Sequence, residues 1–328
     1  MSGESRPNLF TFKFGVARME RSAIRGRWAG DYQIPDFASL HPGYVTEGFI
    51  MPTATPSCQT LRLDRREHAL HITLNRPEAR NALNREMVRD LLAVVEWLEH
   101  QDDVSAVIVR GSGGTFCAGG DIKGFLEQIN TSPPAAGEVD AIATSNRQFG
   151  TFLTRFDALP QIIVMAIEGA AFGGGLGLAA IGDVAVARAD TRFAMSETGL
   201  GVVPAQIAPF VAARIGVSHA RRLALTGLRF DGREAGRIGL VHYVCENVAD
   251  FEATLTKVIA DIGRCGPGAN AATKRLLLAS RVTPLPALLD DASQAFASAM
   301  RSAEGREGVS AFLEKRKASW AQRGSADE

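Results

Sequence analysis

Residues 161–187, QIIVMAIEGAAFGGGLGLAAIGDVAVA, contain the signal that decides the fold. The apolar run IIVMAI predicts a buried β-strand, and VAVA at the end of the stretch predicts another. Between them lie three consecutive glycines, Gly173–Gly175, and a short apolar helix, LGLAA. A strand, a helix and a second strand in this order predict a parallel α/β core. Glycine at the strand-to-helix junction lets another molecule approach the backbone closely.

A second stretch of the same kind lies earlier in the chain. The strand SAVIVRG, residues 105–111, is followed by the loop SGGTFCAGG and the predicted helix IKGFLEQI. The first N–H groups of a helix are unpaired and stand at the positive end of its dipole. Two such groups that converge on one substrate oxygen make an oxyanion hole. Each loop alone is also consistent with tight turns or close helix packing, and neither fits a dinucleotide or triphosphate motif.

Regular patterning begins near residue 60. Residues 60–74, TLRLDRREHALHITL, alternate apolar and polar side chains and predict a hairpin that turns near Arg66–His68. Apolar residues at helical spacing predict a helix from residue 85, with Asn84 as its N-cap. After about residue 204 the pattern is mostly helical. The sequence therefore predicts an α/β fold with a helical C-terminal region.

The first fifty residues differ from the rest of the chain. They show no sustained period, and their aromatic side chains are scattered among glycine, proline and arginine. We expect them to be a disordered tail or an artefact of the assigned start site. The predicted division is an N-terminal extension (1–57), a core (58–255) and a C-terminal helical region (256–328).

Composition argues against several classes of function. The 36 basic and 36 acidic residues give a formal net charge of zero, so no basic excess attracts nucleic acid or an anionic membrane. No apolar run reaches the roughly 20 residues of a membrane span, and we expect no cleavable leader. The four cysteines are scattered without metal-binding spacing, which predicts reduced thiols, a cytoplasmic location and no metal site.

Five ordered motifs carry a resemblance to a known family: LNRPEARNALNREMV, FCAGGDIKGF, GAAFGGGLGLAAIGDVAVA, FAMSETGLGVVPA and REGVSAFLEKRKASW. Over residues 60–322 the chain resembles the crotonase, or enoyl-CoA hydratase/isomerase, family. The resemblance implies a spiral of ββα turns with a C-terminal helical region that forms homotrimers or dimers of trimers. It implies an acyl-CoA substrate and no separate cofactor. It also implies that the backbone N–H groups of Gly120 and Gly174 form the oxyanion hole for the thioester oxygen.

The acid–base residues implied by the resemblance are incomplete. Hydratases of this family typically use two glutamates; one corresponds to Glu197 in this chain, and the other position is Gly177. Apolar neighbours on both sides of Glu197 are expected to raise the pKa of this catalytic carboxyl. A single glutamate is typical of the family's double-bond isomerases. The motifs themselves most resemble bacterial hydratases of methylglutaconyl-CoA and isohexenylglutaconyl-CoA, in which this glycine and the pattern of PAQIAPF are typical.

Three hypotheses follow, in order of preference. The first is a hydratase that adds water to a branched glutaconyl-CoA, with Gln206 of PAQIAPF as a candidate for orienting the water. The second is an enoyl-CoA isomerase that uses Glu197 alone. The third, from another class, is a non-catalytic acyl-CoA-binding subunit.

The resemblance also implies six coenzyme A contacts: Ala79, Arg80, Asp121, Ile122, Phe312 and Lys315. The first two match the stretch that lines pantetheine and adenine, and the next two offer backbone to the adenine. The last two match a C-terminal motif that contacts the coenzyme, often across a subunit boundary. A solvated surface arginine at position 80 and a plain amphipathic tail helix remain the alternatives.

Overall fold

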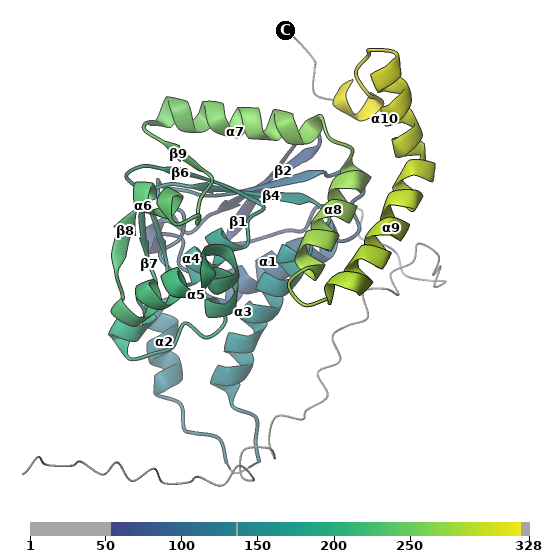
Figure 1. Ribbon diagram of the computed structural model, residues 1–328. Coiled ribbons are helices and arrows are strands. Elements are labelled where there is room, and N and C mark those ends of the chain that lie inside the picture. The colour runs from purple at the N-terminus through teal and green to yellow at the C-terminus, as the bar shows by residue number, and fades with distance from the viewer. Residues whose placement is uncertain (1–53, 136, 323–328) are drawn as a thin grey trace, which may run out of the picture. The chain divides into compact units, whose positions relative to one another are not determined.

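The computed structural model describes residues 54–135 and 137–322 of the chain, and these belong to one compact unit, Met51–Glu328. The first fifty residues, and with them most of the predicted N-terminal extension, lie outside the described residues. The further division between residues 255 and 256 stays a prediction. The fold is mixed α/β with a largely parallel sheet, which confirms the predicted fold class (Figure 1).

Within the described residues, the main sheet has six strands in the order β1-β2-β3-β4-β6-β9. The pair β1 and β2 is antiparallel and forms the predicted hairpin, whereas every other pair is parallel. A smaller sheet has the order β5-β7-β8. The strands span Leu61–Arg66 (β1), Ala69–Leu74 (β2), Ala106–Gly111 (β3), Ile162–Ile167 (β4), Ala170–Phe172 (β5), Val184–Arg188 (β6), Arg192–Ala194 (β7), Arg229–Asp231 (β8) and Tyr243–Cys245 (β9).

Both faces of the main sheet are buried, as the near-continuous apolar runs of its central strands predict. Val107 of β3 lies in a core cluster with helices α1 (Arg85–Leu98) and α3 (Ala141–Asp157). Ile108, its neighbour, points to the opposite face and packs with α7 (Val248–Gly263). Figure 1 shows α7 running across one face of the sheet, with α1 and α3 on the other side.

The glycine-rich loops leave the sheet at the same edge, because β3 and β4 are parallel and in register from Ala106–Ile162 onward. The chain leaves β3 through residues 112–121 and enters α2 (Ile122–Ile129). It leaves β4 through the short strand β5 and enters α4 (Gly174–Ala180). Both helices therefore begin close to the end of the sheet where the two loops start.

The C-terminal helices contact one another more than they contact the sheet. Helix α9 (Leu285–Arg301) contains no buried residue, and several of its large apolar side chains are exposed: Leu285, Leu289, Phe296 and Met300. None of the described helices is long and apolar enough to cross a membrane. The remaining elements are α5 (Ala208–Thr226), α6 (Gly232–Arg237), α8 (Pro267–Ala279), α10 (Ala303–Leu313) and the short 3₁₀ helices η2 (Pro77–Ala79), η3 (Glu197–Leu200) and η4 (Ser319–Gln322).

Candidate active site

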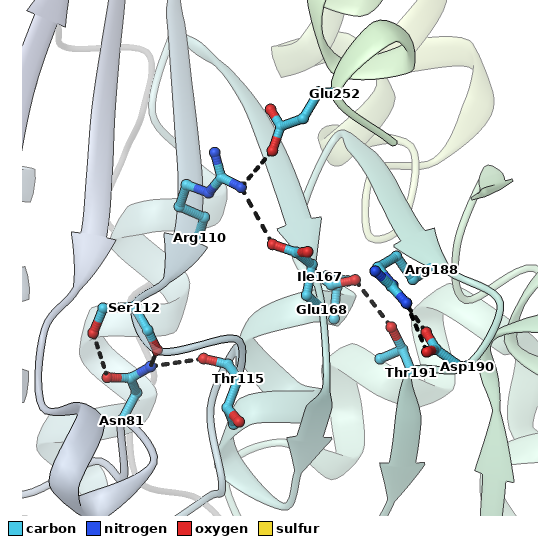
Figure 2. Close-up of polar contacts among 10 residues, drawn as sticks. All are labelled: Asn81, Arg110, Ser112, Thr115, Ile167, Glu168, Arg188, Asp190, Thr191 and Glu252. Atoms are coloured by element: carbon cyan, nitrogen blue, oxygen red, sulfur yellow. Dashed lines mark hydrogen bonds and ion pairs between the residues drawn. The ribbon is translucent and has the colours of Figure 1, made fainter. Parts of the chain in front are cut away.

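Ion pairs and backbone hydrogen bonds join the two glycine-rich loops where they leave the sheet. Arg110, at the end of β3, pairs with Glu168, just after β4, at 3.2 Å, and with Glu252 of α7 at 2.7 Å (Figure 2). The Phe116 N–H donates to the Glu168 carbonyl, and the Cys117 N–H donates to the Ala170 carbonyl, both at 2.9 Å. The loops are therefore bound to each other along their length and not only at their ends.

A buried asparagine fixes the start of the first loop. Asn81 is fully buried and has a positive φ of 56°, which asparagine tolerates better than most residues. Its Nδ2 donates to the carbonyls of Ser112 (2.9 Å) and Thr115 (2.7 Å), as Figure 2 shows. Its Oδ1 accepts the Arg76 N–H at 2.9 Å. One side chain thus holds three backbone groups of two neighbouring loops.

The backbones of the two loops approach each other at Gly119. A Cβ on this residue would lie 2.8 Å from the Phe172 carbonyl oxygen, and its φ is +97°, so only glycine fits without strain. Leu83 also pairs with the first loop, since its N–H donates to the Gly119 carbonyl at 2.7 Å. The next residue, Gly120, therefore lies beside the residues that precede Gly174.

Gly120 and Gly174 both have backbone N–H groups for which the described residues supply no acceptor. Gly174 is the first residue of α4, where an N–H has no partner within the helix. The Leu83 side chain lies against it, because a Cβ on Gly174 would be 2.8 Å from Leu83 Cδ1. The Phe125 ring covers Gly120. Two unpaired donors thus stand in an apolar setting.

Glu197 lies directly beside the second loop. It begins η3, just after β7, and a Cβ on Gly173 would lie 2.8 Å from Glu197 Oε1. Gly173 has a φ of 49°, a conformation that glycine adopts without strain. The absence of a side chain also leaves room for the Glu197 carboxylate. Glu197 Oε2 is buried without a hydrogen-bond partner among the described residues. Burial raises the pKa of Glu197, as expected from its apolar neighbours.

The position of the second family glutamate is closed. Gly177 lies one turn further along α4, and a Cβ there would overlap Ile207 Cγ2 and lie 2.6 Å from Ile207 Cβ. Ile207 is 3% exposed and belongs to the main core cluster. An isoleucine from the start of α5 therefore occupies the space into which a side chain at position 177 would point.

Known proteins resemble this chain over most of its length. The sequence model of the family "Enoyl-CoA hydratase/isomerase" matches residues 64–323. The chain belongs to the enoyl-CoA hydratase/isomerase family. It is 34% identical over 257 residues to the putative enoyl-CoA hydratase/isomerase YngF of Bacillus subtilis, covering 77% of this chain and 94% of the relative. It is 31% identical over 257 residues to the 2,3-dehydroadipyl-CoA hydratase of Escherichia coli, covering 78% and 96%.

Solved structures agree with this membership. The structure of Pseudomonas aeruginosa AtuE is 50% identical and superposes with a TM-score of 0.77, covering 80% of this chain and 100% of the other. The family's relatives differ in chemistry, since another one is named 1,2-epoxyphenylacetyl-CoA isomerase. Family membership therefore confirms the predicted crotonase fold and leaves the choice between hydratase and isomerase to the site.

Four of the six coenzyme A candidates lie on two loops that the structure joins, residues 76–83 and 118–122. Asp121 caps α2 by accepting the Lys123 N–H (3.1 Å) and pairs with Arg76 at 3.0 Å. Although burial acts in the opposite direction, these contacts hold the pKa of Asp121 below its usual value. Arg80 is exposed, and its carbonyl accepts the Ala118 N–H at 3.0 Å. Ala79 directly precedes Arg80 at the end of η2, and Ile122 directly follows Asp121 as the first residue of α2.

Phe312 and Lys315 lie elsewhere. They stand at the end of α10, where Phe312 is 83% exposed, and no hydrogen bond or ion pair of the described residues joins either to the glycine-rich loops. Within one chain they are not part of the site.

The sequence interpretation missed several residues that shape the site. Arg76 pairs with Asp121 of the first glycine-rich loop. The available signal in the sequence was its place within the first family motif, directly before a proline. Arg110 and Glu168 immediately follow apolar strand residues, and a charge at a predicted strand end was the available signal there. Nothing in the local sequence marks Ile207 as the neighbour of Gly177.

Proposed function

We propose that the protein is an enoyl-CoA hydratase, a lyase that adds water across the α,β double bond of an acyl-CoA thioester. The observation that carries the proposal is the Glu197 carboxylate, which lies against Gly173, next to the unpaired N–H of Gly174. A carboxylate with a buried oxygen, Oε2, that has no hydrogen-bond partner in the part of the chain that the structure describes is suited to exchange a proton with a bound ligand.

In the proposed mechanism the thioester oxygen accepts hydrogen bonds from the Gly120 and Gly174 N–H groups. Glu197 removes a proton from water, and the resulting hydroxide bonds to the β carbon. The electron pair of the double bond moves toward the thioester oxygen as an enolate. The α carbon then takes the proton from Glu197, which restores the carboxylate. Each fixed donor supplies about 2.7–4 kcal/mol of stabilisation to the developing negative charge.

We propose a branched glutaconyl-CoA, of the methylglutaconyl or isohexenylglutaconyl type, as the substrate. The motif around Gly177 and PAQIAPF supports this choice. A relative named 2,3-dehydroadipyl-CoA hydratase shows that the family includes an enzyme for a dicarboxylic acyl group. The coenzyme belongs to the substrate, and the proposed chemistry requires no other cofactor. A cytoplasmic location is in keeping with Cys58, Cys117, Cys245 and Cys265, none of which forms a disulfide.

The second candidate is an enoyl-CoA isomerase. Ile207 favours it, because the space beside Gly177 holds an apolar side chain instead of a second carboxylate. In that reaction Glu197 takes a proton from one carbon of the acyl chain and returns it to another.

Product analysis in deuterated water separates the two. With a 2-enoyl-CoA, a hydratase forms a 3-hydroxyacyl-CoA that carries one deuterium at the α carbon. Conversion of a 3-enoyl-CoA to its 2-enoyl isomer without a hydroxyl product would establish the isomerase. Binding of both thioesters with turnover of neither, and no response to Glu197→Gln, would leave only a non-catalytic acyl-CoA-binding subunit.

We also propose that the protein assembles as a homotrimer or a dimer of trimers, in which Phe312 and Lys315 reach the coenzyme bound to a neighbouring subunit. The exposed apolar side chains of α9, among them Phe296 at 69% exposure, support this proposal. Sedimentation velocity is expected to show a trimer or hexamer for the natural chain and smaller species for Phe296→Asp. A monomer at micromolar concentration of the natural chain would contradict it.

A further inference from the structure

Leu83 lies next to both of the proposed oxyanion donors, and it contacts one loop through its backbone and the other through its side chain. It is 8% exposed and belongs to the main core cluster. The next residue, Asn84, caps α1 by accepting the Met87 N–H at 2.9 Å. The backbone at Leu83 is therefore attached directly to the start of a long buried helix.

The backbone of Leu83 sets the direction of the Gly120 N–H. The Leu83 N–H donates to the Gly119 carbonyl at 2.7 Å, and the Leu83 carbonyl accepts the Asp121 N–H at 3.0 Å, so that Leu83 and Gly120 form a parallel bridge. In such a bridge the two flanking residues carry the hydrogen bonds, and the central residue turns its own N–H and carbonyl away from the partner segment. The Gly120 N–H therefore points away from Leu83, on the side where the described residues supply no acceptor for it.

The side chain of Leu83 lies against the second donor residue. A Cβ on Gly174 would be 2.8 Å from Leu83 Cδ1 and 3.5 Å from the Phe149 ring, so these two apolar side chains pack on the first residue of α4. Close packing of this kind leaves a backbone little freedom to shift. The Leu83 side chain therefore limits the movement of the Gly174 peptide toward the segment that holds Gly120.

We propose that Leu83 is a positioning residue that sets the distance and the relative direction of the two oxyanion donors. This inference rests on the proposed function, because it assumes that the Gly120 and Gly174 N–H groups bind one thioester oxygen. Leu83 acts through these two glycines and transfers no proton. The donors bind the enolate more strongly than the substrate, so a small displacement of either N–H lowers the rate more than the affinity.

The first test is kinetic and uses Leu83→Val, a small change that keeps the backbone bridge and removes the reach of Cδ1. With an enoyl-CoA that the natural chain converts, kcat is expected to fall by about 10–100-fold, with KM little changed. Leu83→Met, whose flexible side chain again reaches Gly174, is expected to recover most of that loss. The matched control is Leu91→Val. Leu91 lies on α1, is 1% exposed and belongs to the same core cluster, so this variant makes an equal change away from the two loops and is expected to keep the natural kcat.

The second test measures the donors without turnover. Acetoacetyl-CoA loses a proton to form an enolate that absorbs in the near ultraviolet and carries part of its negative charge on the thioester oxygen. Donors that bind this oxygen lower the pKa of the bound ligand, which a pH titration of the absorbance measures. The natural chain and Leu91→Val are expected to lower the pKa of acetoacetyl-CoA equally, whereas Leu83→Val is expected to lose most of this shift.

The outcomes separate the role of Leu83 from the proposed function. A full pKa shift of the ligand in Leu83→Val, or equal losses of kcat in Leu83→Val and Leu91→Val, would overturn the positioning role. An unshifted pKa of acetoacetyl-CoA bound to the natural chain would instead overturn the oxyanion hole itself. A shifted pKa without a 3-hydroxyacyl product from any 2-enoyl-CoA would leave the role of Leu83 in place and overturn the proposed hydratase.

Discussion

Two glycines one turn apart, Gly173 at the N-cap of α4 and Gly177 within it, differ in how the space beside each is used. At Gly173 the missing side chain leaves room for the Glu197 carboxylate, whereas at Gly177 the room is filled by Ile207. The first position places a titratable group next to the unpaired N–H of Gly174, and the second extends the apolar core to the proposed site. A glycine in this region can therefore make room for a titratable side chain or for an apolar core side chain. Which of these roles it has depends on the residue that packs against it, and this residue is not evident from the local sequence.

The largest expected effect is on the Gly173 side. Glu197→Gln keeps the size of the side chain but removes the proton acceptor, so kcat is expected to fall by about 10²–10⁴-fold, with KM little changed. Steady-state kinetics with a 2-enoyl-CoA measures the loss. The control on the other side is Ile207→Val, which removes one methyl group and is expected to change kcat only slightly. Comparable losses of kcat in Glu197→Gln and Ile207→Val would contradict the different roles assigned to the spaces beside Gly173 and Gly177.

On the Gly177 side the expected effect is on stability. Gly177→Ala places a Cβ against the Ile207 side chain and is expected to lower the free energy of unfolding by about 1–3 kcal/mol through overpacking. Urea unfolding checks this value. Gly124→Ala is the control, because a Cβ at that position of α2 meets nothing within 4 Å, and it is expected to stabilise the helix slightly. If both variants are equally stable, Ile207 does not close the position.

A smaller effect concerns the contribution of Glu197 to folding. Burial raises its pKa in the folded chain, so its contribution to stability is most favourable below the pKa of the unfolded chain and is lost as the pH rises through the folded pKa. Glu197→Gln is therefore expected to be more stable at pH 7 by about 1–3 kcal/mol and to lose this advantage near pH 4. Thermal unfolding across this pH range measures the difference, and a gain that persists in acid would contradict burial of the charged carboxylate as its cause.

The smallest expected effect is on the pH dependence of the rate. The proposed mechanism uses Glu197 as a base, and burial raises its pKa, so the acid limb of the kcat/KM profile is expected to lie above the ordinary glutamate value of 4.5. The position of the limb should respond to changes at Gly173 more than to changes at Gly177. A limb at or below 4.5 would mean that water reaches the carboxylate freely.

Local signals in the sequence predicted much of the fold. The hairpin β1-β2 follows from strict alternation, and the Asn84 side chain accepts the Met87 N–H at 2.9 Å, as predicted for an N-cap. The apolar neighbours of Glu197 in sequence also predicted the direction of its pKa shift. These features depend on residues close together in the chain, where propensity and spacing carry most of the information.

The remaining features depend on how separate elements dock. That Ile207 covers Gly177 follows from the packing of the start of α5 against α4, and that Gln206 crosses Gly150 follows from the same chain segment passing α3. No period or motif encodes such a contact between residues far apart in sequence. The family resemblance named Gly177 as the position of a missing glutamate, but it did not say what fills the space.

The isoleucine beside Gly177 also constrains the paths by which the protein can evolve. Gain of a second carboxylate at position 177 by one replacement would meet a filled volume, so the first viable step is a smaller residue at 207. That step alone opens a hole in the core and brings no new chemistry. Under the proposed mechanism, a second carboxylate at position 177 therefore requires changes at both 177 and 207, which favours divergence in substrate choice over divergence in mechanism.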